Sequence, residues 1–201
     1  MIIFAWLSLI TADAAAPQWK NQGQSEGVTI ESRPMKGSSF DELRLTAKSP
    51  RKPTELCRAA WGDGALKKAE PGFIARQVLK ESENERWTYE QISTPIVSNR
   101  DYTMHAKRVS DATTGICQVL FDTRNQDGPP VANGFVRIPR ISGSWTLEPE
   151  GDGTLITYLI YSEPGGNIAA WMAKGGQKSS AVKWMKTILA RADTTTATTK
   201  Q

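Results

Sequence analysis

The sequence predicts an α+β domain in which an antiparallel β-sheet curls around a long C-terminal helix. Three observations support this fold class. Residues 73–161 form a series of β-prone segments joined by polar turns, and residues 167–191 carry apolar side chains at helical spacing. A chain of 201 residues with 39% apolar residues suits one domain with its own hydrophobic core.

Two strands and a short helix are expected before the main series of strands. Segments 28–31 and 43–47 alternate as strands do, and they flank a turn at residues 36–39. The pattern then changes in "SPRKPTELCRAAW", where Pro53 suits the first turn of a helix. This helix is expected to end at Gly62.

The main series of strands predicts an antiparallel meander. Its strands are expected at residues 74–79, 87–92, 102–109, 116–123, 135–147 and 154–162. Each is followed by a polar or Gly/Pro-containing turn, so consecutive strands should pair. The last strand stops at Pro164-Gly165-Gly166, which should turn the chain back across the sheet into the closing helix.

Composition argues against several classes of function. The formal charge is +4, but acidic and basic residues alternate without a basic stripe that carries aromatics, so no nucleic-acid partner is expected. One histidine and two cysteines without ligand spacing predict no metal site. The sequence shows no pair of titratable groups of the kind that catalysis needs, so neither an enzyme nor a cofactor is expected. We interpret His105, on an expected strand, as a solvated or otherwise satisfied histidine.

The first 14 residues are interpreted as a signal peptide. Residues 2–10 (IIFAWLSLI) are apolar, and Ala12-Asp13-Ala14 fits a signal-peptidase site. The export signal lacks an early Lys or Arg, so a buried N-terminal strand is the alternative. On the export hypothesis the protein is periplasmic or secreted, and soluble. The domain proper is expected at residues 27–192, with a disordered tail at 193–201.

Cys57 and Cys117 are separated by sixty residues. An oxidising compartment would permit a disulfide between them. Two buried free thiols are the alternative, because spacing alone does not show that the two Cα atoms approach within about 7 Å.

Several motifs resemble one family of lipid-binding domains. They are "PIVSNRDYTM" (95–104), "NGFVR" (133–137) and "GSWTLEPEGDGTLITYLIYSEPGGNIAAW" (143–171), in this order and followed by the closing helix. Together they resemble the START domains, the lipid-transfer domains related to steroidogenic acute regulatory protein. The resemblance implies a helix-grip fold with an internal tunnel for one lipid or other hydrophobic molecule, in a monomeric protein that is not an enzyme. A helix-grip aromatase/cyclase and a ligand-gated interaction module are the alternatives.

The resemblance also implies a polar pair inside the tunnel. Glu90 matches the acidic position of that pair, but Ala106 stands where the basic partner is expected. Arg137 is the best remaining basic candidate, because a buried carboxylate without a partner is costly. The alternative is that both are solvated strand residues. Other residues expected to line the tunnel, or else simply the core, are Thr88, Met104, Trp145, Trp171 and Met172.

Gly175 and Gly176 are interpreted as a lid hinge in the closing helix. Two adjacent glycines weaken a helix interior, which would let the segment before them swing open at an anionic membrane surface. Lys174, Lys178 and Lys183 would attract that surface in a transient contact. The alternative is that the glycines allow the helix to pack closely against the sheet.

Overall fold

The computed structural model describes residues 18–62, 72–94, 97–168 and 170–198, so the expected signal peptide lies outside the described residues. In that part of the chain the strands are β1 (Lys20–Ser25), β2 (Val28–Pro34), β3 (Asp41–Ser49), β4 (Phe73–Glu81), β5 (Glu85–Ile92), β6 (Asn99–Ser110), β7 (Cys117–Thr123), β8 (Phe135–Arg137), β9 (Arg140–Glu150) and β10 (Gly153–Glu163). The helices are α1 (Pro53–Trp61) and α2 (Ala170–Thr198), with a 3₁₀ turn at Asn125–Asp127.

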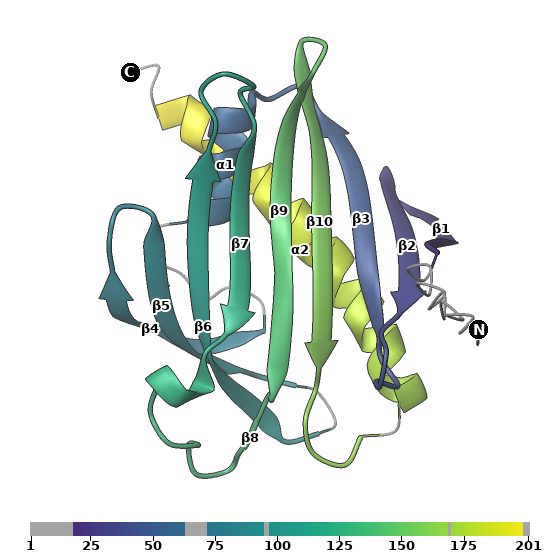
Figure 1. Ribbon diagram of the computed structural model, residues 1–201, viewed down its shortest axis with the longest axis vertical. Coiled ribbons are helices and arrows are strands. Elements are labelled where there is room, and N and C mark those ends of the chain that lie inside the picture. Colours follow the sequence, from purple (N-terminus) through teal and green to yellow (C-terminus); the bar gives the residue numbers. More distant parts are fainter. Residues whose placement is uncertain (1–17, 63–71, 95–96, 169, 199–201) are drawn as a thin grey trace, which may run out of the picture.

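The strands form one sheet in the order β1-β2-β3-β10-β9-β7-β6-β5-β4. The meander from β4 to β10 is confirmed, and β3 pairs with β10, so the first three strands extend the same sheet. The sheet bends around α2, which runs obliquely across its concave face (Figure 1). This is the helix-grip architecture that the sequence predicts.

The core lies between α2, α1 and the concave face of the central strands. Alternate residues of each strand face it, as in β2, where Val28 and Ile30 are buried. From α2, Val182, Met185 and Ile188 pack into the same cluster. Helix α2 also reaches the far edge of the sheet, since Trp184 meets the ring of Phe73 edge-on at 5.5 Å. The helix therefore spans the concave face from the β2–β3 side to β4.

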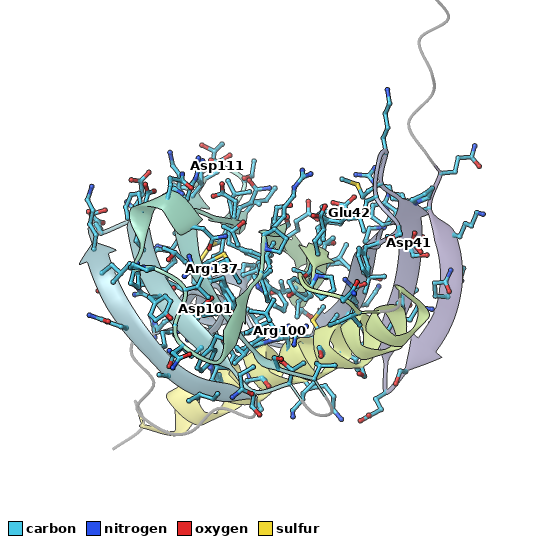
Figure 2. The ribbon with its side chains drawn as sticks, turned by 90° about the horizontal axis from the view of Figure 1, so that it is seen from below. Asp41, Glu42, Arg100, Asp101, Asp111 and Arg137 are labelled. Atoms are coloured by element: carbon cyan, nitrogen blue, oxygen red, sulfur yellow. A yellow bond between two sulfur atoms is a disulfide. The ribbon has the colours of Figure 1, made fainter. Side chains whose placement is uncertain are left out.

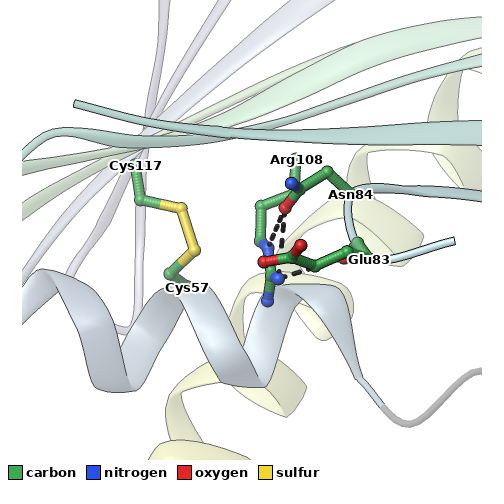
Figure 3. Close-up of a disulfide and its surroundings, with 5 residues drawn as sticks. All are labelled: Cys57, Glu83, Asn84, Arg108 and Cys117. Carbon is green, nitrogen blue, oxygen red and sulfur yellow. Dashed lines mark hydrogen bonds between the residues drawn. A yellow bond between two sulfur atoms is a disulfide. The ribbon is translucent and has the colours of Figure 1, made fainter.

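A disulfide fastens α1 to the sheet. Pro53 is the first residue of α1, where its missing N–H costs nothing, and Gly62 ends the helix with a φ of 63°. Cys57 of α1 is bonded to Cys117 of β7, with their Cα atoms 6.0 Å apart (Figure 3). Both side chains are buried in the core. The alternative of two free thiols at Cys57 and Cys117 is therefore wrong.

The turn between β10 and α2 is fixed by close contacts. Gly165 and Gly166 have φ values of 68° and 65°, and a Cβ atom on Gly165 would lie 2.5 Å from the carbonyl oxygen of Arg137. The guanidinium of Arg100 donates to the carbonyls of Pro164 and Gly165 at 3.3 and 3.4 Å. The abrupt stop after β10 is therefore a glycine turn clamped by an arginine from β6.

The structure corrects three expected boundaries. The strand expected at 135–147 is split into β8 and β9, because Pro139 cannot donate a strand hydrogen bond and β8 instead pairs in parallel with β6. Strand β1 was not expected, because its exposed KNQGQS sequence lacks apolar alternation. Helix α2 is longer than expected and ends at Thr198, inside the tail expected at residues 193–201. Within the described ranges, no helix combines the length and apolar composition needed to cross a membrane.

Candidate functional site

A buried polar group lies on the concave face of strands β4, β5 and β6. The carboxylate of Glu90 accepts hydrogen bonds from Arg76 Nε at 2.8 Å, Thr88 Oγ1 at 2.9 Å and Tyr102 OH at 2.6 Å. The side chain of Glu90 is 8% exposed and that of Arg76 is 16% exposed. We call these four residues the Glu90 cluster.

Strand register brings the Glu90 cluster together. Arg76 lies opposite Glu90 in the β4–β5 pair, and Tyr102 lies opposite Glu90 in the β5–β6 pair. Thr88 is two residues before Glu90 on the same strand, so their side chains share a face. The three strands therefore present these side chains at one place without help from a loop.

The electrostatics of the cluster keep Tyr102 as a hydrogen-bond donor. Burial, together with the neighbouring Glu90 carboxylate, raises the pKa of Tyr102 well above its usual value. A carboxylate offers about four acceptor positions, and the three donors of the cluster occupy three of them. One acceptor position on Glu90 Oε2 is left for a further donor.

Apolar side chains surround the cluster on the same face. Met104 lies opposite Thr88 in the β5–β6 register, and it packs with Phe121 and Ile160 against a small buried cluster formed by Tyr102, Ile138 and Ile141. The concave face near β6 thus combines one compact polar group with an apolar surround, which is the usual composition of a site for a small amphiphilic molecule.

Of the two tryptophans expected to line the tunnel or the core, the structure describes the side chain of Trp145. Trp145 of β9 stacks on Tyr158 of β10, with ring centroids 3.9 Å apart, and it is a member of the main core cluster. Trp145 therefore fills the core between β9 and α2. Trp171 and Met172 lie in the first turn of α2, and their side chains are outside the described part of the structure.

The expected pairing of Glu90 with Arg137 is wrong. Arg137 Nε donates to Asp101 Oδ1 at 2.7 Å, and Figure 2 shows the two residues side by side. Asp101 also accepts from Tyr89 OH, on the opposite face of β5 from Glu90. The sequence contains a signal for the true partner. In the predicted hairpin of residues 74–79 and 87–92, Arg76 lies opposite Glu90, as the structure shows.

The pair of Asp101 and Arg137 should make stability sensitive to acid. Burial raises the pKa of Asp101, but donors from Arg137, the Ala132 amide and Tyr89 outweigh it and hold the pKa below its usual value of 3.8. The stabilisation is present above that value and is lost as pH falls through the lower folded-state pKa. We expect Asp101→Asn to lower the melting temperature at pH 7 and to flatten its fall between pH 4 and 2. An unchanged acid limb in thermal melts of the variant would contradict this assignment.

His105 lies on the outer face of the sheet. Its ring stacks on Trp87 at 4.2 Å, and Nδ1 lies 3.4 Å from Asp122 Oδ1. Its Nε2 is buried without a hydrogen-bond partner. The ring is therefore packed, with a polar neighbour at one nitrogen and none at the other, and it lies on the opposite face of the sheet from the Glu90 cluster.

The glycine pair in α2 is not explained by close packing. A Cβ atom at Gly175 or Gly176 would meet nothing within 4 Å, and both residues are exposed. The alternative that they allow close contact with the sheet is therefore wrong. Helix α2 runs through both residues without interruption.

Similarity of this chain to known proteins is limited at the level of sequence. No protein-family model matches the sequence. A Pseudomonas aeruginosa protein described as uncharacterised is 27% identical over 173 residues, which cover 82% of this chain and 81% of that protein.

Solved structures give the clearer result. A STAR-related lipid transfer protein from Xanthomonas axonopodis matches with a TM-score of 0.77 and 27% identity, over 87% of this chain and 98% of that chain. Human StAR-related lipid transfer protein 5 matches with a TM-score of 0.75 and 14% identity, over 91% and 89% of the two chains. The aromatase/cyclase Zhui from Streptomyces sp. R1128 has a TM-score of 0.51 and 10% identity, over 76% and 93%, and shares the fold alone.

Proposed function

We propose that this chain, which is similar to STAR-related lipid transfer domains, binds one lipid or similar apolar molecule between the concave face of its sheet and α2. The bound molecule would be carried between membranes or sensed. Binding is favoured over catalysis because the 27%-identical Xanthomonas axonopodis protein is described as a lipid transfer protein, whereas the likeness to an aromatase/cyclase is one of fold only.

The observation that carries this proposal is the Glu90 cluster. Three donors hold the carboxylate of Glu90 in an apolar surround and leave one acceptor position unused. A ligand with a hydroxyl or other donor as its head would complete the cluster, while its apolar body would lie near Met104 and Phe121. The proposed ligand class is therefore an amphiphile with a small donor head, such as a long-chain alcohol or a sterol.

Matched ligand pairs test this proposal. Delipidated protein is melted with each alcohol or sterol and with its methyl ether, which keeps the shape but lacks the donor. A hydrogen bond to a charged group contributes about 1.5–3 kcal/mol, so we expect the alcohol to bind roughly ten- to hundredfold more tightly. Equal melting shifts for alcohol and ether would reject the role of Glu90. No shift across fatty acids, phospholipids and sterols would reject lipid binding itself.

Export is proposed together with ligand binding. The disulfide between Cys57 and Cys117 supports an oxidising compartment, since such bonds are rare where glutathione keeps thiols reduced. The periplasm or the extracellular space is the proposed location. Quantifying the mature protein and its N-terminal residue in cell fractions tests this, and a reduced, uncleaved protein in the cytoplasm would contradict it.

The glycine pair is proposed as the hinge that lets α2 open. Changing Gly175 and Gly176 together to alanine should stabilise the fold by about 1.5–2 kcal/mol, because nothing blocks the added methyl groups and each glycine costs a helix about 1 kcal/mol. If the hinge opens the ligand site, lipid uptake and release should both become slower while affinity stays nearly unchanged.

The control for the hinge is Ser180→Ala, on an exposed position of the same helix. It should leave both exchange rates unchanged. Stopped-flow exchange of a fluorescent lipid measures these rates. If the glycine double variant is more stable than the wild type but exchanges lipid at the wild-type rate, the hinge is rejected.

A further inference from the structure

The two edges of the sheet differ in character. Among the described residues, β1 and β4 are the terminal strands, so each leaves one row of backbone N–H and C=O groups without a strand partner. Strand β1 (KNQGQS) is short and polar, which is a common protection of a sheet edge. Strand β4 (FIARQVLKE) is longer and carries large apolar residues, as strands that pair on both sides do. It lies at one side of the molecule, beyond β5 (Figure 1).

Large apolar side chains are exposed on β4. Ile74 is 48% exposed and Leu79 is 36% exposed, and they are two of the five large apolar residues that are exposed in the described part of the chain. Each is the extra residue of a β-bulge in the β4–β5 pair. A bulge leaves its extra residue unpaired with the neighbouring strand. A further strand beside β4 would cover both side chains.

Charge selects one register for pairing β4 with a second copy of itself. An antiparallel pair of identical strands has a two-fold axis, and opposite residues must share a face of the sheet, so the axis lies at a residue. Near the middle of β4, an axis at Arg76 would place that cation opposite itself, and an axis at Val78 would place Arg76 opposite Lys80. Like charges directly opposite each other are destabilising. An axis at Gln77 avoids both contacts.

The register centred on Gln77 also covers the exposed side chains. It places Leu79 opposite the partner's Ala75, and Ile74 opposite the partner's Lys80. The methylene stem of a lysine covers apolar surface while its ammonium stays in water. Because the two-fold axis repeats every contact, four such pairs form around it.

The Glu90 cluster would gain cover from this pairing. Arg76, the charged partner of Glu90, lies on the edge strand, and its side chain is 16% exposed. On the concave face, the same register places the partner's Val78 opposite Arg76. A dimer would therefore shield the ion pair further from water.

We infer that β4 is a dimerisation strand: two copies of this chain pair antiparallel along β4, with the two-fold axis at Gln77, and form one continuous sheet. This differs from the monomer that the family resemblance implies, and it does not depend on lipid binding. One pair of strands is a small interface compared with the roughly 1,600 Å² of a standard one. The dimer should therefore be weak and reversible, with a Kd on the order of 10 μM.

Cysteine cross-linking tests the register. Gln77→Cys places each new cysteine opposite its own copy, where the Cα atoms of an antiparallel pair lie about 4.5–5.5 Å apart, within reach of a disulfide. Ala75→Cys is the matched control: Ala75 is exposed on the same face of β4, but its two copies would lie about 13 Å apart along the strands. After mild oxidation at about 100 μM protein, Gln77→Cys should run as a covalent dimer on a non-reducing gel and the control as a monomer. Equal cross-linking of both variants, or of neither, would overturn the inference.

Sedimentation equilibrium tests the dimer without a cross-link. The wild type should change from monomer to dimer between about 1 and 100 μM protein. Ile74→Lys puts a second cation opposite the partner's Lys80, twice in each dimer, and should weaken the dimer about tenfold, whereas Ile74→Glu should stay within about twofold of the wild type. Thermal melts of both variants check that the exposed position leaves the fold intact. A wild type that stays monomeric throughout, or equal effects of the two substitutions, would overturn the inference.

Discussion

Replacing Arg76 by leucine is expected to destabilise the protein by about 3–5 kcal/mol, because it leaves the buried carboxylate of Glu90 without its charged partner. The ion pair is short and mostly shielded from water, with Arg76 Nε 2.8 Å from Glu90 Oε1. Urea unfolding at pH 7 measures the effect as a lower midpoint at unchanged slope.

The double change Arg76→Leu with Glu90→Gln should be milder than Arg76→Leu alone, because a neutral amide costs less to bury than an unpaired carboxylate. A matched control is Arg33→Leu. Arg33 also pairs with a glutamate, Glu42, but its side chain is 30% exposed, so its loss should cost about 1 kcal/mol or less. Equal, small and additive effects at positions 76 and 90 would mean that water already solvates the pair.

Removing the disulfide is the second change with a large expected effect. The bond closes a loop with a sequence separation of 60 residues, and the loop-entropy relation assigns such a link about 4 kcal/mol. The double variant Cys57→Ala with Cys117→Ala should lose that amount in urea unfolding. Its fold should remain, because α1 also packs against α2 and the core cluster.

Reduction provides the control for the disulfide. Both sulfurs are buried, so a mild reductant should leave the folded wild type intact and act only once the chain has unfolded. The alanine variant should be insensitive to reductant throughout. A loss below about 1 kcal/mol in the variant would contradict a bond that constrains the unfolded chain.

The helices and most strands could be predicted because their signals are local. Alternation in β2, Pro53 at the start of α1 and the glycine turn after β10 each depend on a few adjacent residues. Strand β1 could not be predicted from alternation, because an exposed edge strand buries neither face. Its pairing with β2 depends on backbone hydrogen bonds that any sequence can make.

In the candidate site, too, the features with a local sequence signal could be predicted and the long-range contacts could not. Glu90 and Thr88 were assigned correctly to one strand face, since alternation fixes the side of every residue. The partner of Glu90 was assigned to the wrong strand because Arg137 lies on β8, whose parallel pairing with β6 has no local signal. The contact between Asp101 and Arg137 is long-range in sequence, and only the folded sheet brings it together.

The central claim is that the concave face holds one intact lipid with a donor head at Glu90. The most direct measurement is native mass spectrometry of the wild type and of Glu90→Leu with Arg76→Leu, after incubation with a total bacterial lipid extract. The account predicts one lipid per wild-type chain, with the same mass as the free lipid, and a loss of hydroxyl-bearing lipids from the double variant. A wild type that carries no lipid, or a bound species whose mass differs from every lipid supplied, would contradict it.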